Sequence, residues 1–238
     1  MIKLGVNLDH VATIRQQRYT PYPDMLTAIK ISESSGADSI TMHLREDRRH
    51  IQFEDIKLAR KHIKTKLNLE MAPTKEMCKI ANDIKPDFIC LVPEKRQELT
   101  TEGGLDIKKN FDNVSKTISS LRKSEALISL FIEPDIEMVK IAKDLNAGAI
   151  ELHTGKYAEA NIREKDYFLN EIKSSAQYAK NISLVVNAGH GLDYTNVKEI
   201  ARIQEINELN IGHSIIAESI FLGLAEAIKK MKSIIGDA

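Results

Sequence analysis

The chain of 238 residues carries 34 Lys and Arg against 34 Asp and Glu, so its formal net charge is zero with neutral histidines. Hydrophobic residues make up 42% and charged residues 29%, which is typical of globular proteins and unlike disordered ones. Because there is no basic excess to neutralise phosphates, we expect no nucleic-acid partner. No apolar run approaches the roughly 18 residues of a membrane-spanning helix, so we expect no membrane partner.

The start of the chain and its cysteines bear on the compartment. The first ten residues lack the long apolar core of a signal peptide. The two cysteines, Cys78 and Cys90, each stand beside apolar residues. We interpret them as buried thiols in a reducing compartment, not as a disulfide or a redox pair. These features predict a cytoplasmic protein.

Short apolar runs rich in β-branched residues alternate along the chain with longer charged stretches of helical periodicity. The strand-like runs are Lys3–Asp9, Ser39–Arg45, Lys66–Ala72, Asp87–Pro93, Leu127–Glu133, Ala149–His153, Ile182–Ala188 and Ile206–Gly212. The helical stretches are Asp24–Ser35, Glu54–Lys64, Thr74–Ile84, Ile107–Lys123, Pro134–Leu145, Glu164–Lys180, Thr195–Arg202 and Ser214–Ile235. Eight strand–helix units in a chain of this length predict a parallel (β/α)8 barrel, the TIM barrel, as a single α/β domain over residues 1–238.

A doubly wound open sheet is the alternative, but it would place a glycine-rich turn after the first strand. The residues there are Asp-His-Val-Ala-Thr, which do not form such a turn. Local signals predict several helix ends. Asp24 after a proline, Pro134 in a first helical turn and Ser214 as a cap mark helix starts. Gly36 and Gly148 are expected where helices end.

Most of the predicted strands alternate between apolar and polar side chains. In the third, Leu67, Leu69 and Met71 alternate with Asn68 and Glu70. Because successive side chains point to opposite faces of a strand, each such run has one apolar and one polar face. The apolar face must meet the helices, so the polar face is predicted to line the inside of the barrel. Burying ionisable groups there is costly unless they are paired, which favours a catalytic interior over a purely structural one.

The carboxyl ends of barrel strands are where active sites form, and the predicted ends here carry many ionisable side chains. Inward-facing Glu70 is a candidate general base, because desolvation would raise its pKa. The alternative is a structural ion pair between Glu70 and Arg45 or another cation inside the barrel. His43 shares a face with Arg45, and Glu151 shares one with His153. Glu151 could stabilise a cationic intermediate or serve as a structural ion-pair partner. Six of the seven histidines lie at or just beyond strand ends, namely His10, His43, His50, His153, His190 and His213.

Two glycine-containing loops have the character of anion sites, although each could also be only a tight turn. Asn187–Gly191 follows the seventh strand, and Asn210–Ser214 ends the eighth strand and opens a helix. Free N–H groups at a helix N-terminus bind phosphate, and phosphate sites after strands seven and eight recur in barrels. A basic cluster over Arg45–His50, with Arg15 and Arg18 after the first strand, could pair with a second phosphate. A salt-bridged, solvated loop is the alternative interpretation of that cluster.

Several familiar catalytic motifs are missing from the sequence. It has no Gly-x-Ser-x-Gly elbow, no His-Glu-x-x-His motif and no P-loop. No His-x-His pair follows the first strand, which argues against a metal-dependent barrel hydrolase. Histidines and carboxylates could still bind zinc, but we predict a site without a metal ion.

Seven blocks of the chain, in order, resemble the pyridoxine 5′-phosphate synthase family. They are Gly5–Arg15, His43–Ile51, Asn68–Ala72, Leu91–Asp106, Glu151–Gly155, Asn187–Leu192 and Glu208–His213. The resemblance implies a barrel enzyme of the transferase type that closes the pyridine ring in vitamin B6 synthesis. Its two phosphorylated substrates would be 3-amino-2-oxopropyl phosphate and 1-deoxy-D-xylulose 5-phosphate. Its products would be pyridoxine 5′-phosphate, phosphate and water.

The resemblance also implies roles for individual residues. It makes His43 and Glu70 proton acceptors, His190 a proton donor and Glu151 the stabiliser of a charged intermediate. The amino-ketone phosphate would contact Asn7, Arg18, Gly191, Gly212 and His213. The deoxyxylulose phosphate would contact Asp9, His10, Arg45, His50 and Thr100. No cofactor is implied, because the amine comes from the substrate. The loop Glu94–Gly104 would be a lid, and the chain would assemble into a homo-oligomer, an octamer.

Two other functions remain open at the level of sequence. Another phosphate-handling barrel enzyme, an isomerase or aldolase, would use the same anion site with one base, but would not explain the second basic cluster. A non-enzymatic binder of a phosphorylated metabolite would need anion sites but no inward-facing Glu70.

Overall fold

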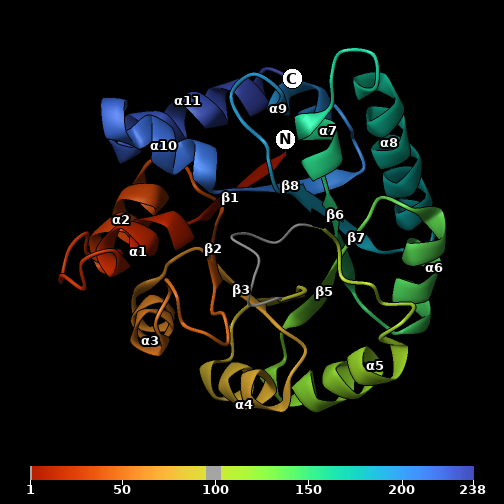
Figure 1. Cartoon of the computed structure of the whole chain (residues 1–238), viewed down its shortest axis with the longest axis horizontal. Coiled ribbons are helices and arrows are strands. Elements are labelled where there is room, and N and C mark those ends of the chain that lie inside the picture. The colour runs from red at the N-terminus through yellow and green to blue at the C-terminus, as the bar shows by residue number, and fades with distance from the viewer. Residues whose placement is uncertain (1, 95–102) are drawn as a thin grey trace.

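Eight parallel strands form a closed barrel in chain order, with β8 paired to β1 (Figure 1). The computed structural model describes residues 2–94 and 103–238. The barrel confirms the predicted (β/α)8 fold class. The strands are β1 Lys3–Asn7, β2 Ser39–His43, β3 Lys66–Met71, β4 Phe88–Leu91, β5 Leu127–Ile132, β6 Ala149–His153, β7 Val185–Gly189 and β8 Ile206–Ile211.

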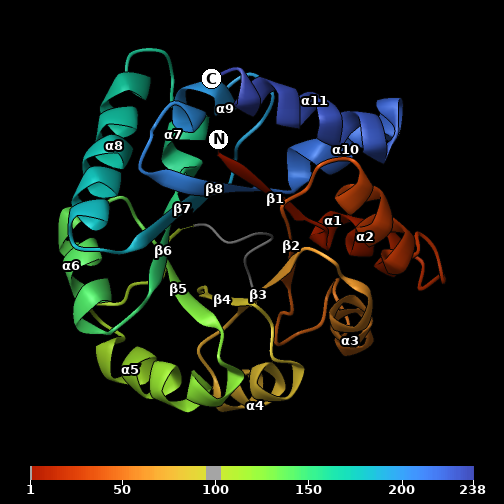
Figure 2. The same ribbon diagram turned by 180° about the vertical axis from the view of Figure 1, so that it is seen from behind.

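Helices form an outer ring around the strands, as the views from both ends of the barrel show (Figures 1 and 2). They are α1 Asp9–Gln16, α2 Met25–Ser34, α3 Phe53–His62, α4 Lys75–Ile84, α5 Phe111–Ser120 with the 3-10 turn η1 Leu121–Ser124, α6 Ile136–Asp144, α7 Gly155–Glu159, α8 Lys165–Asn181, α9 Val197–Ala201, α10 His213–Leu222 and α11 Leu224–Gly236. Among the described residues, no helix combines the length and apolar character needed to span a bilayer.

The main hydrophobic core lies between the strands and the helices. Leu67, Leu69 and Met71 of β3 are fully buried in it, which confirms the predicted outward direction of the apolar residues. Burying one such side chain stabilises the fold by about 1.5–3 kcal/mol. The alternating Asn68 points inward, where its amide donates to Thr41 Oγ1 of β2 at 3.2 Å. The interior is therefore held together by polar contacts between strands.

The pairing register places the candidate site residues on neighbouring strands. His43 at the end of β2 is opposite Glu70 of β3. Glu151 of β6 is opposite Asn187 of β7, and Gly189 of β7 is opposite Asn210 of β8. Residues far apart in the sequence thus converge at one end of the barrel.

Several predicted element boundaries were wrong. The short helices α1 and α7 follow β1 and β6 directly, where no helix was predicted, because a helix of one or two turns shows little periodicity. The single predicted helix Ser214–Ile235 is two helices, α10 and α11. They separate at Gly223, whose φ of +79° is incompatible with a continuous helix. α5 starts at Phe111 rather than Ile107. β7 starts at Val185 rather than Ile182, because the left-handed Ser183, with φ +61°, separates it from the end of α8.

The capping predictions had mixed outcomes. Asp24 is confirmed as an N-cap, because its Oδ2 accepts a hydrogen bond from the backbone N of Thr27 at 2.7 Å. Pro134 lies before the helix, whose N-cap is Asp135. Ser214 lies inside α10 and donates to the carbonyl of Leu192 instead of capping the helix.

The two predicted glycine helix ends also differ. Gly36 follows α2 with a φ of +105°, as expected of a left-handed residue after a helix. After α6, however, Asn146 takes the left-handed conformation at φ +59°, and Gly148 only leads into β6.

Both cysteines are free and buried, as predicted. Cys90 lies inside the barrel in a small apolar cluster with Val92 and Phe131. Burial, together with the Glu151 and Glu70 carboxyls, raises the pKa of the Cys90 thiol well above its ordinary value. This thiol therefore stays protonated and acts as part of the lining of the barrel.

Candidate active site

A cavity of about 710 Å³ opens where the strands end. All the predicted site residues line it except Arg18 and Thr100. Arg18 is exposed just after α1, and Thr100 lies outside the described residues, as does most of the predicted lid Glu94–Gly104. The structure thus brings together residues from β1, β2, β3, β6 and the loops after β7 and β8.

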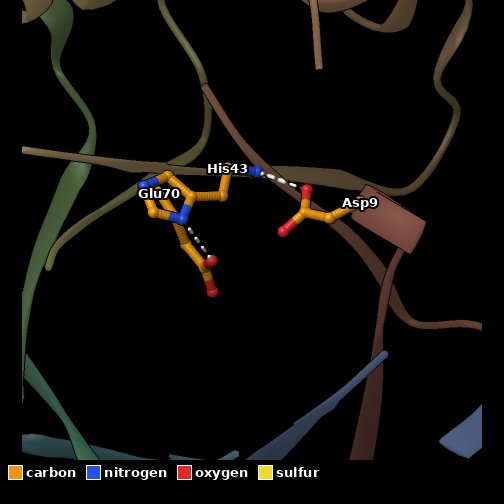
Figure 3. Close-up of side chains that lie close together, drawn as sticks. All are labelled: Asp9, His43 and Glu70. Atoms are coloured by element: carbon orange, nitrogen blue, oxygen red, sulfur yellow. Dashed lines mark hydrogen bonds and ion pairs between the residues drawn. The ribbon is translucent and has the colours of Figure 1, made fainter. Parts of the chain in front are cut away.

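Asp9, His43 and Glu70 converge from α1, β2 and β3 (Figure 3). Asp9 Oδ1 accepts a hydrogen bond from the backbone N of His43 at 2.7 Å. His43 Nδ1 lies 3.9 Å from Glu70 Oε2, and His43 Nε2 is 2.9 Å from Glu94 Oε1. The imidazole is therefore held between two carboxylates, one of which faces the cavity.

Glu70 has the properties expected of an acid–base group. Burial raises its pKa well above the ordinary value, and the nearby Asp9 and Glu151 carboxyls raise it further. His43 lies within 4 Å of it, while Arg45 Nε lies 3.5 Å from Asp47 Oδ1. Glu70 therefore holds a proton more readily than an exposed glutamate does and can exchange it with a ligand in the cavity.

The same three residues form the one cluster of possible metal ligands in the described part of the chain, with ligand atoms within 4.8 Å of one another. A zinc ion would need each ligand atom at about 2.0–2.2 Å. Asp9 already accepts hydrogen bonds from the His43 backbone and from Asn7 Nδ2. His43 is held by Glu94. A site without metal therefore stays our prediction.

Glu151 is buried deeper in the barrel. Its Oε2 accepts a hydrogen bond from Asn210 Nδ2 at 2.6 Å, and Asn210 Oδ1 accepts one from Thr41 Oγ1 at 3.1 Å. Burial raises the pKa of Glu151 to about 7, and Glu208 contributes to the rise, although the Asn210 hydrogen bond opposes it. Glu151 therefore changes its charge close to neutral pH.

Replacing Glu151 with Gln should remove a pH-dependent part of the stability. The carboxyl has a pKa of about 7 in the folded protein against 4.5 ordinarily, so the folded protein holds a proton that the unfolded chain releases. This contribution to stability is fully present below about pH 4.5 and is lost as the pH rises through about 7. We expect the unfolding free energy of the variant, relative to wild type, to rise by on the order of 3 kcal/mol over this range. Urea denaturation at several pH values measures the difference, and a constant difference would contradict the prediction.

The loops after β7 and β8 present backbone groups to the cavity. His190 and Gly191 both have positive φ angles, +82° and +75°. Gly212 precedes α10, whose first turn starts at His213. The His213 ring packs edge-on against His10 at a centroid distance of 4.7 Å. A helix N-terminus flanked by imidazoles is suited to bind a phosphate group.

Three imidazoles around the cavity are uncharged at neutral pH. Burial lowers the pKa of His190 to about 4, with further lowering by His153 and His10. Burial also lowers the pKa of His10, with a contribution from His213, although Asp9 opposes it. Burial lowers the pKa of His50 in the same way. An anion bound in the cavity would raise the pKa values of these rings, so that they can take up protons.

Sequence reasoning missed some residues that the structure places in the site. Asn210 and Phe131 line the cavity, and Glu94 holds His43. The sequence placed Asn210 in the predicted anion loop Asn210–Ser214, but not as the hydrogen-bond partner of Glu151. Phe131 carries no comparable signal, because Leu130, Phe131 and Ile132 are all apolar and do not show which face of β5 is inward.

Solved structures share the fold at low sequence identity. An aldolase described as 4-hydroxy-2-oxoglutarate aldolase has a TM-score of 0.65 at 11% identity, over 98% of this chain and 93% of its own. Phosphoribosyl anthranilate isomerase from Thermus thermophilus has a TM-score of 0.63 at 13% identity, over 99% of both chains. At these identities the likeness concerns the barrel alone.

Relatives with high sequence identity carry more information. Pyridoxine 5′-phosphate synthase from Legionella pneumophila (strain Corby) is 52% identical over 236 residues, which are 99% of this chain and 95% of that protein. The synthase from Prochlorococcus marinus (strain AS9601) is 52% identical over 235 residues, 99% of both proteins. The model of the pyridoxal phosphate biosynthesis protein PdxJ family matches residues 4–237. The chain therefore belongs to the PdxJ family of enzymes of vitamin B6 biosynthesis.

Proposed function

We propose that this enzyme condenses 3-amino-2-oxopropyl phosphate with 1-deoxy-D-xylulose 5-phosphate to form pyridoxine 5′-phosphate, phosphate and water. The observation that carries the proposal is one cavity that combines buried carboxyls of raised pKa with imidazoles of lowered pKa. Groups whose pKa values are shifted towards one another can give and take protons near neutral pH. Imine formation, phosphate elimination, ring closure and dehydration need several such transfers.

The charges of the two substrates would shift the pKa values of the acid and the base in the cavity. A phosphate dianion near Gly191 and the start of α10 would raise the pKa of His190, so that this ring carries the proton it is to donate. The substrate ammonium group would lower the pKa of Glu70, so that this carboxyl becomes a base. The substrates themselves thus set the starting protonation of the acid and the base.

The remaining roles follow from position. His43, held between Glu70 and Glu94, would act as the second proton acceptor. Glu151, which titrates near neutral pH, would stabilise a cationic intermediate in the interior. Arg45 and His50 would face the second phosphate, with Asp9 and His10 beside it. Holding both substrates in one cavity would supply proximity.

The direct test is to mix the purified protein with both substrates and to follow pyridine-ring absorbance and released phosphate together. We expect equal amounts of the two products, unchanged by a metal chelator, because no step needs a metal ion. Loss of activity with the chelator, restored by an added metal, would contradict the metal-free site. Turnover of one phosphorylated substrate alone would favour an isomerase or aldolase instead.

We further propose that the chain forms a homo-oligomer through the exposed end of α10. Ile220, Phe221 and Leu222 are 70%, 84% and 46% exposed, an unusually apolar surface for one helix end. The double variant Ile220→Ser with Phe221→Ser should lower the molar mass measured by light scattering in solution. Ile162→Ser, at an isolated residue that is 90% exposed, should leave the mass unchanged. An unchanged mass in the double variant would exclude this surface.

A further inference from the structure

His190 has a backbone conformation that is rare for a residue with a side chain. Its φ is +82°, and the following Gly191 is also left-handed at +75°. Residues other than glycine adopt such angles only when their surroundings hold them there. The surroundings of His190 therefore decide where its imidazole lies.

Thr154, at the end of β6, holds the backbone of this turn. Its hydroxyl lies 2.6 Å from the carbonyl oxygen of His190 and 2.8 Å from that of Gly189, and its single proton is shared between these two acceptors. Its backbone N donates to the same Gly189 carbonyl at 2.9 Å. The Thr154 side chain is completely buried, so it has no access to a ligand in the cavity.

His153, the preceding residue, supports the imidazole of His190. The two ring centroids are 5.1 Å apart, and the His153 ring also packs edge-on against Phe131 at 5.2 Å. His153 Nδ1 is 2.9 Å from Glu133 Oε1. Its Nε2 is buried and has no hydrogen-bond partner among residues 2–94 and 103–238. The ring is 6% exposed and is not part of the cavity lining.

Glu133 is the ionised carboxylate that contacts Nδ1 of the His153 ring. Burial opposes its ionisation, but hydrogen bonds from His153, Lys156 and the backbone N of Gly104 outweigh burial and lower the pKa of Glu133 to about 2. An ionised carboxylate can only accept, so Nδ1 of His153 must carry a proton. Glu133 thus sets both the tautomer and the orientation of the His153 ring.

We propose that these residues position His190 for proton transfer without touching the substrate. The positioning group consists of Glu133, His153 and Thr154. Thr154 holds the strained backbone, and the ring fixed by Glu133 holds the imidazole. The proposal rests on the proposed function, because His190 is the proton donor there. None of these three residues lines the cavity, so the proposal extends the set of residues on which proton transfer depends.

Two pairs of variants test the positioning group. Thr154→Val keeps the shape of the side chain and removes the hydroxyl, whereas Thr154→Ser keeps the hydroxyl. We expect Thr154→Val to lower kcat about 10-fold with KM within threefold, and Thr154→Ser to restore it. Glu133→Gln should lower kcat by about 10- to 100-fold. Glu137→Gln, which removes an exposed carboxylate of the neighbouring α6, should have no effect.

A spectroscopic measurement separates positioning from a merely structural role. In protein with ¹⁵N-labelled histidines, the His153 ring, assigned with a His153→Gln variant, should show its proton on Nδ1. Glu133→Gln should change that tautomer while the protein stays folded. A wild-type Nδ1 without a proton, or full kcat in both Thr154→Val and Glu133→Gln, would overturn the proposal.

The possible failures are distinguishable. If the wild-type protein makes no pyridoxine 5′-phosphate, the proposed function fails, while the His153 tautomer still reports whether Glu133 controls the ring. If Glu133→Gln does not fold, the Thr154 pair decides the matter through kcat. Equal kcat in the valine and serine variants would then overturn the proposal.

Discussion

Replacing Glu70 with Gln should lower kcat by about 100- to 10,000-fold, the usual contribution of a general base. The amide keeps the size of the side chain but cannot take a proton. The variant should still bind 1-deoxy-D-xylulose 5-phosphate with a Kd close to that of wild type, because the anion sites lie on other strands. Steady-state assays and titration calorimetry measure the two quantities.

The control for this variant is Glu226→Gln on α11, where the carboxylate is exposed and pairs with Lys229. It should leave both kcat and Kd unchanged. Unchanged turnover in Glu70→Gln would remove Glu70 from the mechanism. Lost binding together with lost turnover would instead make Glu70 a ligand-binding group.

The second large effect is expected from Gly5→Ala in β1. An added Cβ at Gly5 would lie 2.1 Å from Asn210 Oδ1 and 2.8 Å from Ser39 Oγ. Asn210 would have to move, which breaks its hydrogen bonds with Thr41 and Glu151 inside the barrel. Leaving buried polar groups unpaired costs about 1–3 kcal/mol for each group. We therefore expect the unfolding free energy to fall by about 2–4 kcal/mol.

Chemical denaturation measures this loss, and Gly236→Ala provides the matched control. Gly236 ends α11 with nothing within 4 Å of an added Cβ, so its unfolding free energy should stay equal or rise slightly. kcat of Gly5→Ala should also fall, because Glu151 loses its Asn210 partner. A stable and fully active Gly5→Ala would show that the interior network tolerates rearrangement.

The sequence predicted the barrel because the alternation of short apolar runs and amphipathic stretches is local. Each strand shows its apolar face in its own residues, as Leu67, Leu69 and Met71 do, and eight such units leave few other folds. The same alternation places Glu70 inside the barrel, because its two neighbours in the strand both face the helices. It could not reveal α1 or α7, because one or two helical turns leave no periodicity to read.

The sequence predicted which residues gather in the site, but not which of them contact one another. That histidines and carboxyls gather at the strand ends follows from the parallel topology. Which of them meet depends on register, and register comes from the packing of all eight strands together. Glu94 on His43, Asn210 on Glu151 and Glu133 on His153 each join residues from different strands.

The sequence by itself thus determined the fold class, the inward direction of the ionisable side chains and the family. The tertiary structure alone decided their pairing, and with it their charge. A pKa depends on burial and on neighbours within a few ångströms, and closure of the barrel sets both. Glu133 directly follows β5 and Glu151 lies within the neighbouring β6, yet one has a pKa of about 2 and the other about 7. The difference arises because cations and donors surround Glu133, whereas Glu151 is buried near another carboxyl.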